Sequence, residues 1–190
     1  MNNLTSESKI SILDKEQEWI SMSKKNPEYF KPIYEHYFKL IFRFIYDKTR
    51  DKDLTADLVS QVFVKALTNL NKYTYQGFPF SSWLYKIASN EIAAYYRKSN
   101  KNRWVNIDEH MLEGIFEDTK GPDLENLRQG LEKVIEGLSH MEVQILELRY
   151  YENKSYKEIG YMLSLSETNV KTKSFRIIEK IRSKIKISNE

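Results

Sequence analysis

The chain has 190 residues, of which 41% are hydrophobic and 13% aromatic, and this composition predicts one folded domain or two small ones rather than a disordered chain. The absence of cysteine excludes disulfides, thiol catalysis and cysteine-bound zinc or iron–sulfur sites, and it is compatible with a reducing compartment. A net charge of +3 does not by itself indicate a polyanionic partner, and because neither a secretory signal nor a run of about 18 apolar residues occurs, we expect a cytoplasmic protein without membrane insertion.

The first 26 residues are the least informative part of the chain. Residues 1 to about 13 are polar and are expected to be frayed, and a short amphipathic helix around Trp19 is expected to follow. We therefore separate residues 1–26, a tail with a short helix, from the strongly patterned part that begins at Pro27.

Two long amphipathic helices are predicted next. Apolar side chains recur at helical spacing over residues 30–45 and again over 54–70, and the charged stretch 47–53 between them is expected to be a turn. These helices are expected to form the core of a first domain, residues 27–103. The outer face of the second helix carries Asp57, Ser60, Gln61 and Lys65.

An aromatic loop is predicted at residues 71–82, because Gly77 and Pro79 interrupt regular structure there. Each aromatic side chain of this loop can pack into the core. Alternatively, they form a platform on which unpaired bases stack, at about 1–3 kcal/mol per base. The sequence leaves both interpretations open. The aromatic residues are Tyr73, Tyr75, Phe78 and Phe80.

A helix capped by Ser81 or Ser82 is predicted to follow this loop. Its apolar side chains over residues 83–92 are expected to face the core. Aromatic side chains interleaved with cations on the other side are typical of a surface that binds nucleic acid. The residues expected on that surface are Asn90, Tyr95, Tyr96, Arg97 and Lys98.

Charge is distributed unevenly along the second half of the chain. Residues 106–136 contain nine acidic and three basic residues, whereas residues 154–186 contain nine basic and three acidic ones. Residues 104–122 lack a sustained period and end in a Gly-Pro pair, so we expect them to be a flexible acidic linker. With the smaller basic cluster at residues 97–103, this pattern suggests two contacts with a polyanion.

The second domain is expected to cover residues 123–190 and to begin with a helix over 124–138, whose leucines recur at helical spacing. A further helix follows, and its start is marked by the capping box formed by Ser139 and Glu142.

The chain closes with a predicted helix-turn-helix. Ser155 and Glu158 form another capping box, a turn is expected at Ser164 and Leu165, and Ser166 is expected to cap the last helix. The outer face of that helix suits the major groove of DNA, but an ordinary solvated face has the same composition, and this stretch alone leaves both open. The outward residues are Thr168, Asn169, Lys171, Thr172 and Arg176.

No strand-type alternation appears in the sequence, which therefore predicts an all-α protein of two small helical domains joined by a flexible linker, with the helix-turn-helix in the C-terminal domain. Three stretches in this order resemble the extracytoplasmic-function sigma factors, a group within the bacterial RNA polymerase sigma family. They are TADLVSQVFVKAL at 55–67, FPFSSWLYKIASNEIAAYYRK at 78–98, and the segment 138–182 that contains the helix-turn-helix.

The resemblance implies promoter-specific transcription initiation and a role for each surface. Residues 27–103 would correspond to sigma region 2 and residues 123–190 to region 4. The implied polymerase contacts, to the clamp helices of the β′ subunit, are Asp57, Ser60, Gln61 and Lys65. The implied contacts to single-stranded minus-ten DNA are Tyr75, Phe78, Phe80, Ser81, Asn90, Arg97 and Lys98. The implied contacts to the duplex minus-thirty-five element are Thr168, Asn169, Lys171, Thr172, Lys173 and Arg176.

Two positions depart from the family pattern. Ser60 and Gln61 stand where members commonly have Gln-Glu, so one charged contact of the docking motif is missing. Ser164 replaces the usual glycine of the turn, and a left-handed backbone there would cost free energy. Implied partners are core RNA polymerase, promoter DNA and an anti-sigma factor, with no cofactor and no metal.

Two other classes of function fit the sequence less well. A conventional DNA-binding regulator would use the helix-turn-helix and treat the first domain as a dimerisation or ligand module, but it leaves the basic, aromatic surface of that domain unexplained. An enzyme is disfavoured, because His36, His110 and His140 lack metal-ligand spacing and no glycine loop for phosphate is present.

Overall fold

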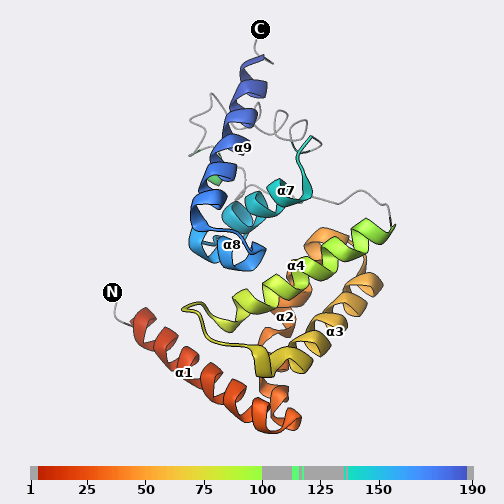
Figure 1. The fold of residues 1–190 in the computed structure, drawn as a ribbon, viewed down its shortest axis with the longest axis vertical. Helices are drawn as coiled ribbons and strands as arrows, with labels where there is room; N and C mark the ends of the chain where they lie inside the picture. Colours follow the sequence, from red (N-terminus) through yellow and green to blue (C-terminus); the bar gives the residue numbers. More distant parts are fainter. Residues whose placement is uncertain (1–3, 100–112, 116, 118–134, 136, 188–190) are drawn as a thin grey trace. The chain divides into compact units, whose positions relative to one another are not determined.

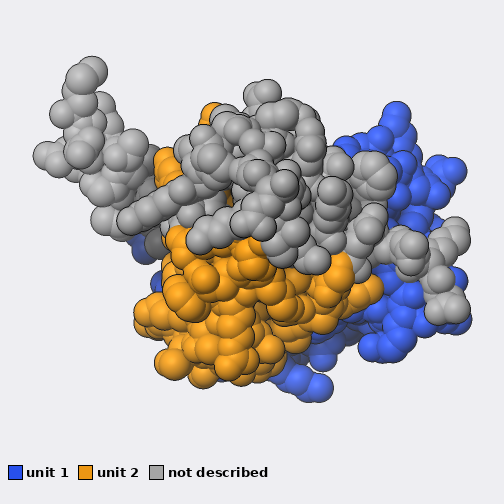
Figure 2. Space-filling model, turned by 90° about the horizontal axis from the view of Figure 1, so that it is seen from above, with its two compact units in different colours: residues 1–104 blue, residues 105–190 orange. Residues whose placement is uncertain are grey.

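A computed structural model describes residues 4–99, 113–115, 117, 135 and 137–187 (Figure 1). All regular elements among these residues are helical, which confirms the predicted all-α class. The chain divides into two compact units, residues 1–104 and 105–190, which Figure 2 colours separately.

Over residues 4–99, the first unit contains four α-helices and two short 3-10 segments. The elements are α1 (Leu4–Lys25), η1 (Pro27–Phe30), α2 (Lys31–Thr49), α3 (Lys52–Asn69), η2 (Leu70–Lys72) and α4 (Phe80–Ser99). Helices α2, α3 and α4 pack against one another, and α1 packs on α2, η1 and η2. The fully buried residues of this core include Ile33, Ile41, Phe44, Ile45, Val62, Ala66, Leu84 and Tyr85.

The prediction of a frayed tail up to about residue 13 is wrong, because α1 begins at Leu4 and runs for 22 residues. No glycine or proline interrupts this stretch, so the backbone can remain helical. Glu16, Ile20 and Ser23 are buried at 1%, 3% and 3% exposure. Tertiary packing therefore stabilises a helix that its polar composition does not reveal.

The predicted turn at residues 47–53 is also too wide. Helix α2 continues to Thr49, and Arg50 adopts a left-handed conformation with φ 52° while its N–H donates to the carbonyl of Tyr46. Lys48 is only 2% exposed, because its ammonium lies over the ring of Phe44, 4.0 Å from the centroid. The Asp51 carboxylate caps α3 by accepting from the N–H of Leu54 at 3.1 Å and from that of the residue before it.

The second unit contains α7 (His140–Leu146), a π-helical segment η3 (Glu147–Tyr151), α8 (Tyr156–Leu163) and α9 (Glu167–Ile187). The capping box of Ser139 and Glu142 is present, with both reciprocal hydrogen bonds. Ser155 caps α8 by accepting from the N–H of Glu158 at 3.2 Å. The π-helical segment was not expected from the sequence.

Most of the predicted linker 104–122 and of the helix predicted at 124–138 lies outside the described residues. Within the linker, Glu113–Ile115 are helical, and Ile115 is fully buried. The ring of Tyr150 lies against Gly114. Gly114 and Ile115 therefore pack as part of the second unit.

The turn between α8 and α9 forms where the sequence predicted it. Ser164 ends α8 with φ 57° and ψ 42°, a left-handed conformation. The N–H of Leu165 donates to the carbonyl of Gly160 at 2.8 Å. Ser166 caps α9 by accepting from the N–H of Asn169 at 3.2 Å. Hydrogen bonds within a few residues therefore set the angle at which α9 leaves the turn.

Replacing Ser164 with glycine is expected to stabilise the second unit by about 1 kcal/mol, because glycine adopts the left-handed conformation without the steric cost that a Cβ imposes. Thermal unfolding of the variant against the parent chain measures the difference. A Ser183→Ala variant serves as the control, because Ser183 is exposed on α9. An unchanged or lower melting temperature in Ser164→Gly contradicts the prediction.

A second prediction concerns Glu142, which links α7 to α9. Its carboxylate accepts from the Lys180 ammonium at 2.8 Å, and the N–H of Ser139 donates to it at 2.8 Å. The Lys180 ammonium and then this backbone hydrogen bond lower the pKa of Glu142 from 4.5 to about 2.

Because the pKa is lower in the folded state, the ionised Glu142 stabilises the fold above pH 4.5, and this stabilisation is lost as the pH falls towards 2. Glu142→Gln is therefore expected to lower the free energy of unfolding at pH 7 by at most about 1 kcal/mol. The difference from the parent chain should shrink below pH 4.5, as chemical denaturation at several pH values would measure. A difference that stays constant across this range contradicts the assignment.

Candidate nucleic-acid and polymerase interfaces

The first turns of α9 present the residues predicted to read duplex DNA. Thr168, Asn169, Thr172 and Arg176 are exposed, and Lys173 is half-buried. Lys171 is also exposed, and its ammonium lies 2.7 Å from the carboxylate of Glu167. The opposite face of the helix is buried through Val170, Ser174, Ile177, Ile178 and Ile181. Burial of that face orients the amide, hydroxyl and cationic groups outward.

Phe175 is an exposed residue of α9 that was not among the predicted outward residues. It is 64% exposed, among side chains that are otherwise polar. Together with Tyr150, Tyr156, Lys171, Ser174, Ile178 and Arg182 it lines a cavity of about 340 Å³ on the second unit. Helical spacing could have indicated its exposure, because position 175, between Ser174 and Arg176, lies outside the stripe of buried residues on α9.

The aromatic loop is divided between core and surface. Tyr75 is 51% exposed and Phe78 is half-buried, next to Gly77 with φ 81°. By contrast, Tyr73 is 4% exposed, and its ring packs on those of Phe80 and Trp83 at centroid distances of 5.0 Å each. The core interpretation therefore holds for Tyr73, whereas Tyr75 and Phe78 retain exposed surface.

Phe80, Ser81 and Tyr96 require correction as surface groups. Phe80 begins α4 and is fully buried, and Ser81 is 8% exposed. Tyr96 is 6% exposed, because its hydroxyl donates to the carbonyl of Lys48 at 2.6 Å. The ring of Phe80 is therefore unavailable for base stacking in this conformation. Asn90, Arg97 and Lys98 are exposed on α4, as expected.

A second cavity of about 340 Å³ lies between α3 and α4. It brings Lys65, one of the predicted polymerase contacts, onto the same surface as Asn90. The Lys65 ammonium lies 2.6 Å from the carboxylate of Glu91, which is 9% exposed. We call this surface the α3–α4 cavity, and its lining residues are Lys65, Asn69, Lys72, Trp83, Lys86, Ile87, Asn90 and Glu91.

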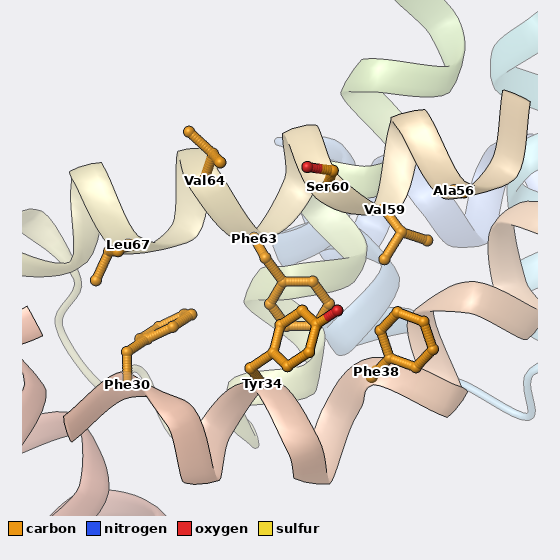
Figure 3. Close-up of a pocket in the computed structure, with 9 residues that line it drawn as sticks. All are labelled: Phe30, Tyr34, Phe38, Ala56, Val59, Ser60, Phe63, Val64 and Leu67. Carbon is orange, nitrogen blue, oxygen red and sulfur yellow. The ribbon is translucent and has the colours of Figure 1, made fainter. Parts of the chain in front are cut away.

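The other three predicted polymerase contacts also lie on α3. Asp57, Ser60 and Gln61 are all exposed. Ser60 lines a cavity of about 400 Å³ between α2 and α3, in which Tyr34 and Val64 are 41% and 57% exposed. Figure 3 shows this α2–α3 groove, whose other lining residues are Phe30, Phe38, Ala56, Val59, Phe63 and Leu67.

The aromatic side of the α2–α3 groove is tightly packed. The rings of Tyr34 and Phe63 contact edge to face with centroids 4.8 Å apart, and those of Tyr34 and Phe38 are 5.3 Å apart. Apolar side chains that remain exposed in a groove are typical of a surface that binds a partner. The helical spacing of Tyr34, Phe38 and Phe63 predicts core positions, and the sequence does not indicate the exposure of Val64.

The described residues contain no cluster of three His, Asp or Glu side chains that could hold a metal ion. Among the same residues, no helix is long and apolar enough to cross a membrane.

Two family models match the chain. Sigma-70 region 2 matches residues 33–102 and Sigma-70 region 4 matches residues 134–183, so together they cover more than half of it. The ECF RNA polymerase sigma factor SigM of Bacillus subtilis is 26% identical over 153 residues, which is 80% of this chain and 91% of SigM. RNA polymerase sigma factor YlaC of the same species is 26% identical over 175 residues, 87% of this chain and 97% of YlaC.

Solved structures show the same fold. CnrH, in complex with the cytosolic domain of CnrY, has a TM-score of 0.57 and 18% identity, with 88% of this chain and 95% of CnrH covered. The sigma factor RpoE of Bartonella quintana, in complex with the anti-sigma factor NepR, has a TM-score of 0.54 and 18% identity, with 83% and 97% covered. On the family models and relatives, this chain belongs to the extracytoplasmic-function group of the sigma-70 family.

Proposed function

We propose that this member of a family of promoter-specific initiation factors binds core RNA polymerase through α3 and reads promoter DNA with both of its units. The observation that carries the proposal is that each unit presents its own exposed amides and cations. On the first unit these are Asn90, Arg97 and Lys98, and on the second they are Asn169 and Arg176.

The minus-thirty-five element would be read as duplex by α9. Asn169 and Arg176 lie seven residues apart on its exposed face, which is about two helical turns. An asparagine amide suits the major-groove edge of adenine, and an arginine guanidinium suits that of guanine. The lysines beside them would neutralise phosphates and position the helix.

The minus-ten element would be captured as single strand by the first unit. Tyr75 and Phe78 are the ring groups of the loop that retain exposed surface for stacking on a base. The α3–α4 cavity adds amide and ammonium groups from Asn90 and Lys65. We therefore move Lys65 from the polymerase surface to the DNA surface, in place of the buried Phe80.

Polymerase docking would use the α2–α3 groove with Asp57, Ser60 and Gln61. Ser60 belongs both to the docking motif that the family resemblance implies and to the lining of the groove. We propose the β′ clamp helices as its occupant. An anti-sigma factor would bind this chain as NepR binds RpoE and CnrY binds CnrH, and would regulate its access to polymerase.

Reconstituted transcription tests the proposal as a whole. The full chain is added to core polymerase of its source organism with a pool of genomic fragments, and the 5′ ends of the transcripts are mapped. We expect start sites that core polymerase alone does not use, preceded by two shared sequence elements. A folded chain that directs no specific start on any fragment would overturn the proposal, and tight operator binding without polymerase would favour a conventional regulator.

Val64→Lys tests the docking surface, because it places a charge in the exposed apolar part of the α2–α3 groove. We expect the affinity for core polymerase to fall at least roughly tenfold, since desolvating an unpaired ammonium opposes binding. Thr68→Lys is the matched control, because Thr68 is exposed one turn further along α3 and does not line the groove. Equal affinities of the two variants for core polymerase would exclude the groove as the docking surface.

A further inference from the structure

Helix α1 holds both ends of the aromatic loop that the proposed function assigns to minus-ten capture. At one end, the Lys24 ammonium donates to the carbonyl of Tyr73 at 2.7 Å, and it lies 5.9 Å from the centroid of the Tyr73 ring. At the other end, the N–H of Phe80 donates to the Glu16 carboxylate at 2.7 Å. Both ends of the loop are thus hydrogen-bonded to charged side chains of α1.

Glu16, Ile20 and Lys24 lie four residues apart, so they share one face of α1. Glu16 and Lys24 are separated by about 12 Å along the helix axis, at about 1.5 Å per residue. Ile20 between them is 3% exposed. A rigid helical spacing is therefore imposed on the two ends of a loop that contains Gly77 and has no helical hydrogen bonds of its own between Tyr73 and Pro79.

The Glu16 carboxylate is held inside the first unit. Its Oε1 accepts from the Tyr37 hydroxyl at 2.5 Å as well as from Phe80, and Glu16 is 1% exposed. The pKa of Tyr37 is raised, chiefly because it is buried and then because it donates to Glu16, so its hydroxyl keeps the proton that it donates. Tyr37 in turn contacts the ring of Phe80, with centroids 6.0 Å apart.

The second oxygen of Glu16, Oε2, is buried without a hydrogen-bond partner. A buried acceptor left unsatisfied costs free energy, and an apolar residue of similar size would avoid that cost. A carboxylate at this position is therefore better explained by the geometry that its other oxygen imposes on Phe80 than by a gain in stability.

The burial and exposure of the loop side chains are consistent with these two attachments. Tyr73, Phe80 and Trp83 pack as a buried aromatic cluster, with the rings of Phe80 and Trp83 5.2 Å apart. Only the segment between the ends is presented outward, where Tyr75 is exposed and Phe78 half-buried. Fixing the ends of a loop lowers the entropy that it loses when it binds a ligand.

We propose that α1 is a positioning element for base capture, in which Lys24 and Glu16 hold the two ends of residues 73–80 so that Tyr75 and Phe78 are preorganised to receive an unpaired DNA base. The inference rests on the proposed function of the loop. Lys24 and Glu16 touch no base themselves and act through the loop backbone.

Lys24→Met tests this inference, because it removes the ammonium while retaining an unbranched side chain of similar length. Lys24→Arg keeps a donor, and Lys25→Met is the matched control on the next residue, which is also exposed. Each full-length variant is combined with core polymerase on a mapped promoter that carries 2-aminopurine in the minus-ten element, whose fluorescence rises when the base leaves the stack. Hydrogen exchange of the amides of residues 73–80 is measured on the free chain.

We expect Lys24→Met to lower the equilibrium constant for base capture roughly threefold to tenfold, the effect of losing one charge-assisted hydrogen bond, and to accelerate amide exchange in the loop. Lys24→Arg and Lys25→Met should remain within about twofold of the parent chain. Binding of a duplex minus-thirty-five fragment should be unchanged in all three, and the faster amide exchange in Lys24→Met should be confined to residues 73–80, which a substitution that destabilised the whole unit would not achieve.

Base capture or loop exchange that is the same in Lys24→Met and Lys25→Met overturns the positioning role, provided that the parent chain opens the promoter. A parent chain that starts no specific transcript overturns the proposed function, and the inference with it. The two failures are therefore distinguished by the parent chain alone.

Discussion

Replacing Gly160 with alanine is expected to destabilise the second unit by about 2–3 kcal/mol, the largest effect that we expect from a single methyl group in this chain. A Cβ at this position would lie 2.7 Å from the carbonyl oxygen of Leu165 and 3.4 Å from the backbone nitrogen of Glu167. Both are backbone atoms of the turn, so no side-chain rotation relieves the clash. The turn itself must shift, and α9 with it.

The measurement is thermal unfolding combined with binding of a duplex that carries the minus-thirty-five element. Both should weaken in Gly160→Ala, whereas the Ser183→Ala control should match the parent chain. Ser164→Gly on the same turn is expected to change stability in the opposite direction, so the pair separates crowding at Gly160 from the left-handed backbone at Ser164. Parent-like stability of Gly160→Ala would show that the turn relaxes freely.

Replacing Asn169 with alanine is expected to relax discrimination at one or two upstream base pairs by about 1–3 kcal/mol per pair, because a bidentate amide contact is lost. Asn169 is exposed in the first turn of α9, and its N–H is already engaged by the cap residue Ser166 at 3.2 Å. The cap fixes the backbone and leaves the side-chain amide exposed, on the surface that the proposed function assigns to DNA. Binding of the full chain with polymerase to a set of single-base variants of the minus-thirty-five element measures the effect.

Lys171→Ala provides the contrast for Asn169, because Lys171 is exposed on the same helix and pairs with Glu167 in the absence of DNA. We expect it to weaken binding to all variants equally and to reduce the salt dependence by about one phosphate contact. If Asn169→Ala instead weakens binding to all variants equally, Asn169 contacts a phosphate and not a base.

The starts of α7, α8 and α9 and the helix-turn-helix were predictable because the interactions that form them are local, whereas α4 begins at Phe80, before its predicted cap residues Ser81 and Ser82. Ser139, Ser155 and Ser166 each accept from a backbone N–H three residues later. The exposed and buried faces of α9 likewise follow from a period of 3.6 residues. These contacts join residues that are only a few positions apart, so the sequence alone specifies them.

The sequence did not indicate the features that depend on residues far apart in the chain. Lys65 joins the surface of Asn90 because α3 packs on α4, and its partner Glu91 is 26 residues away. Lys48 is buried although its charge suggested a turn: its ammonium lies over the ring of Phe44, and its backbone carbonyl accepts from the hydroxyl of Tyr96, 48 residues further along the chain. A helical period shows which face is apolar but not which element covers it.

By itself, the sequence determined an all-helical chain, the position of its helix-turn-helix and the outward residues of its last helix. Only the tertiary structure decided which side chains of the aromatic loop are exposed. Phe80 is buried and Tyr75 exposed because Glu16, which precedes Phe80 by 64 residues, and Lys24, which precedes Tyr73 by 49, hold the two ends of the loop. The physical reason is that burial and hydrogen bonding depend on distance in space, which the order of residues does not give.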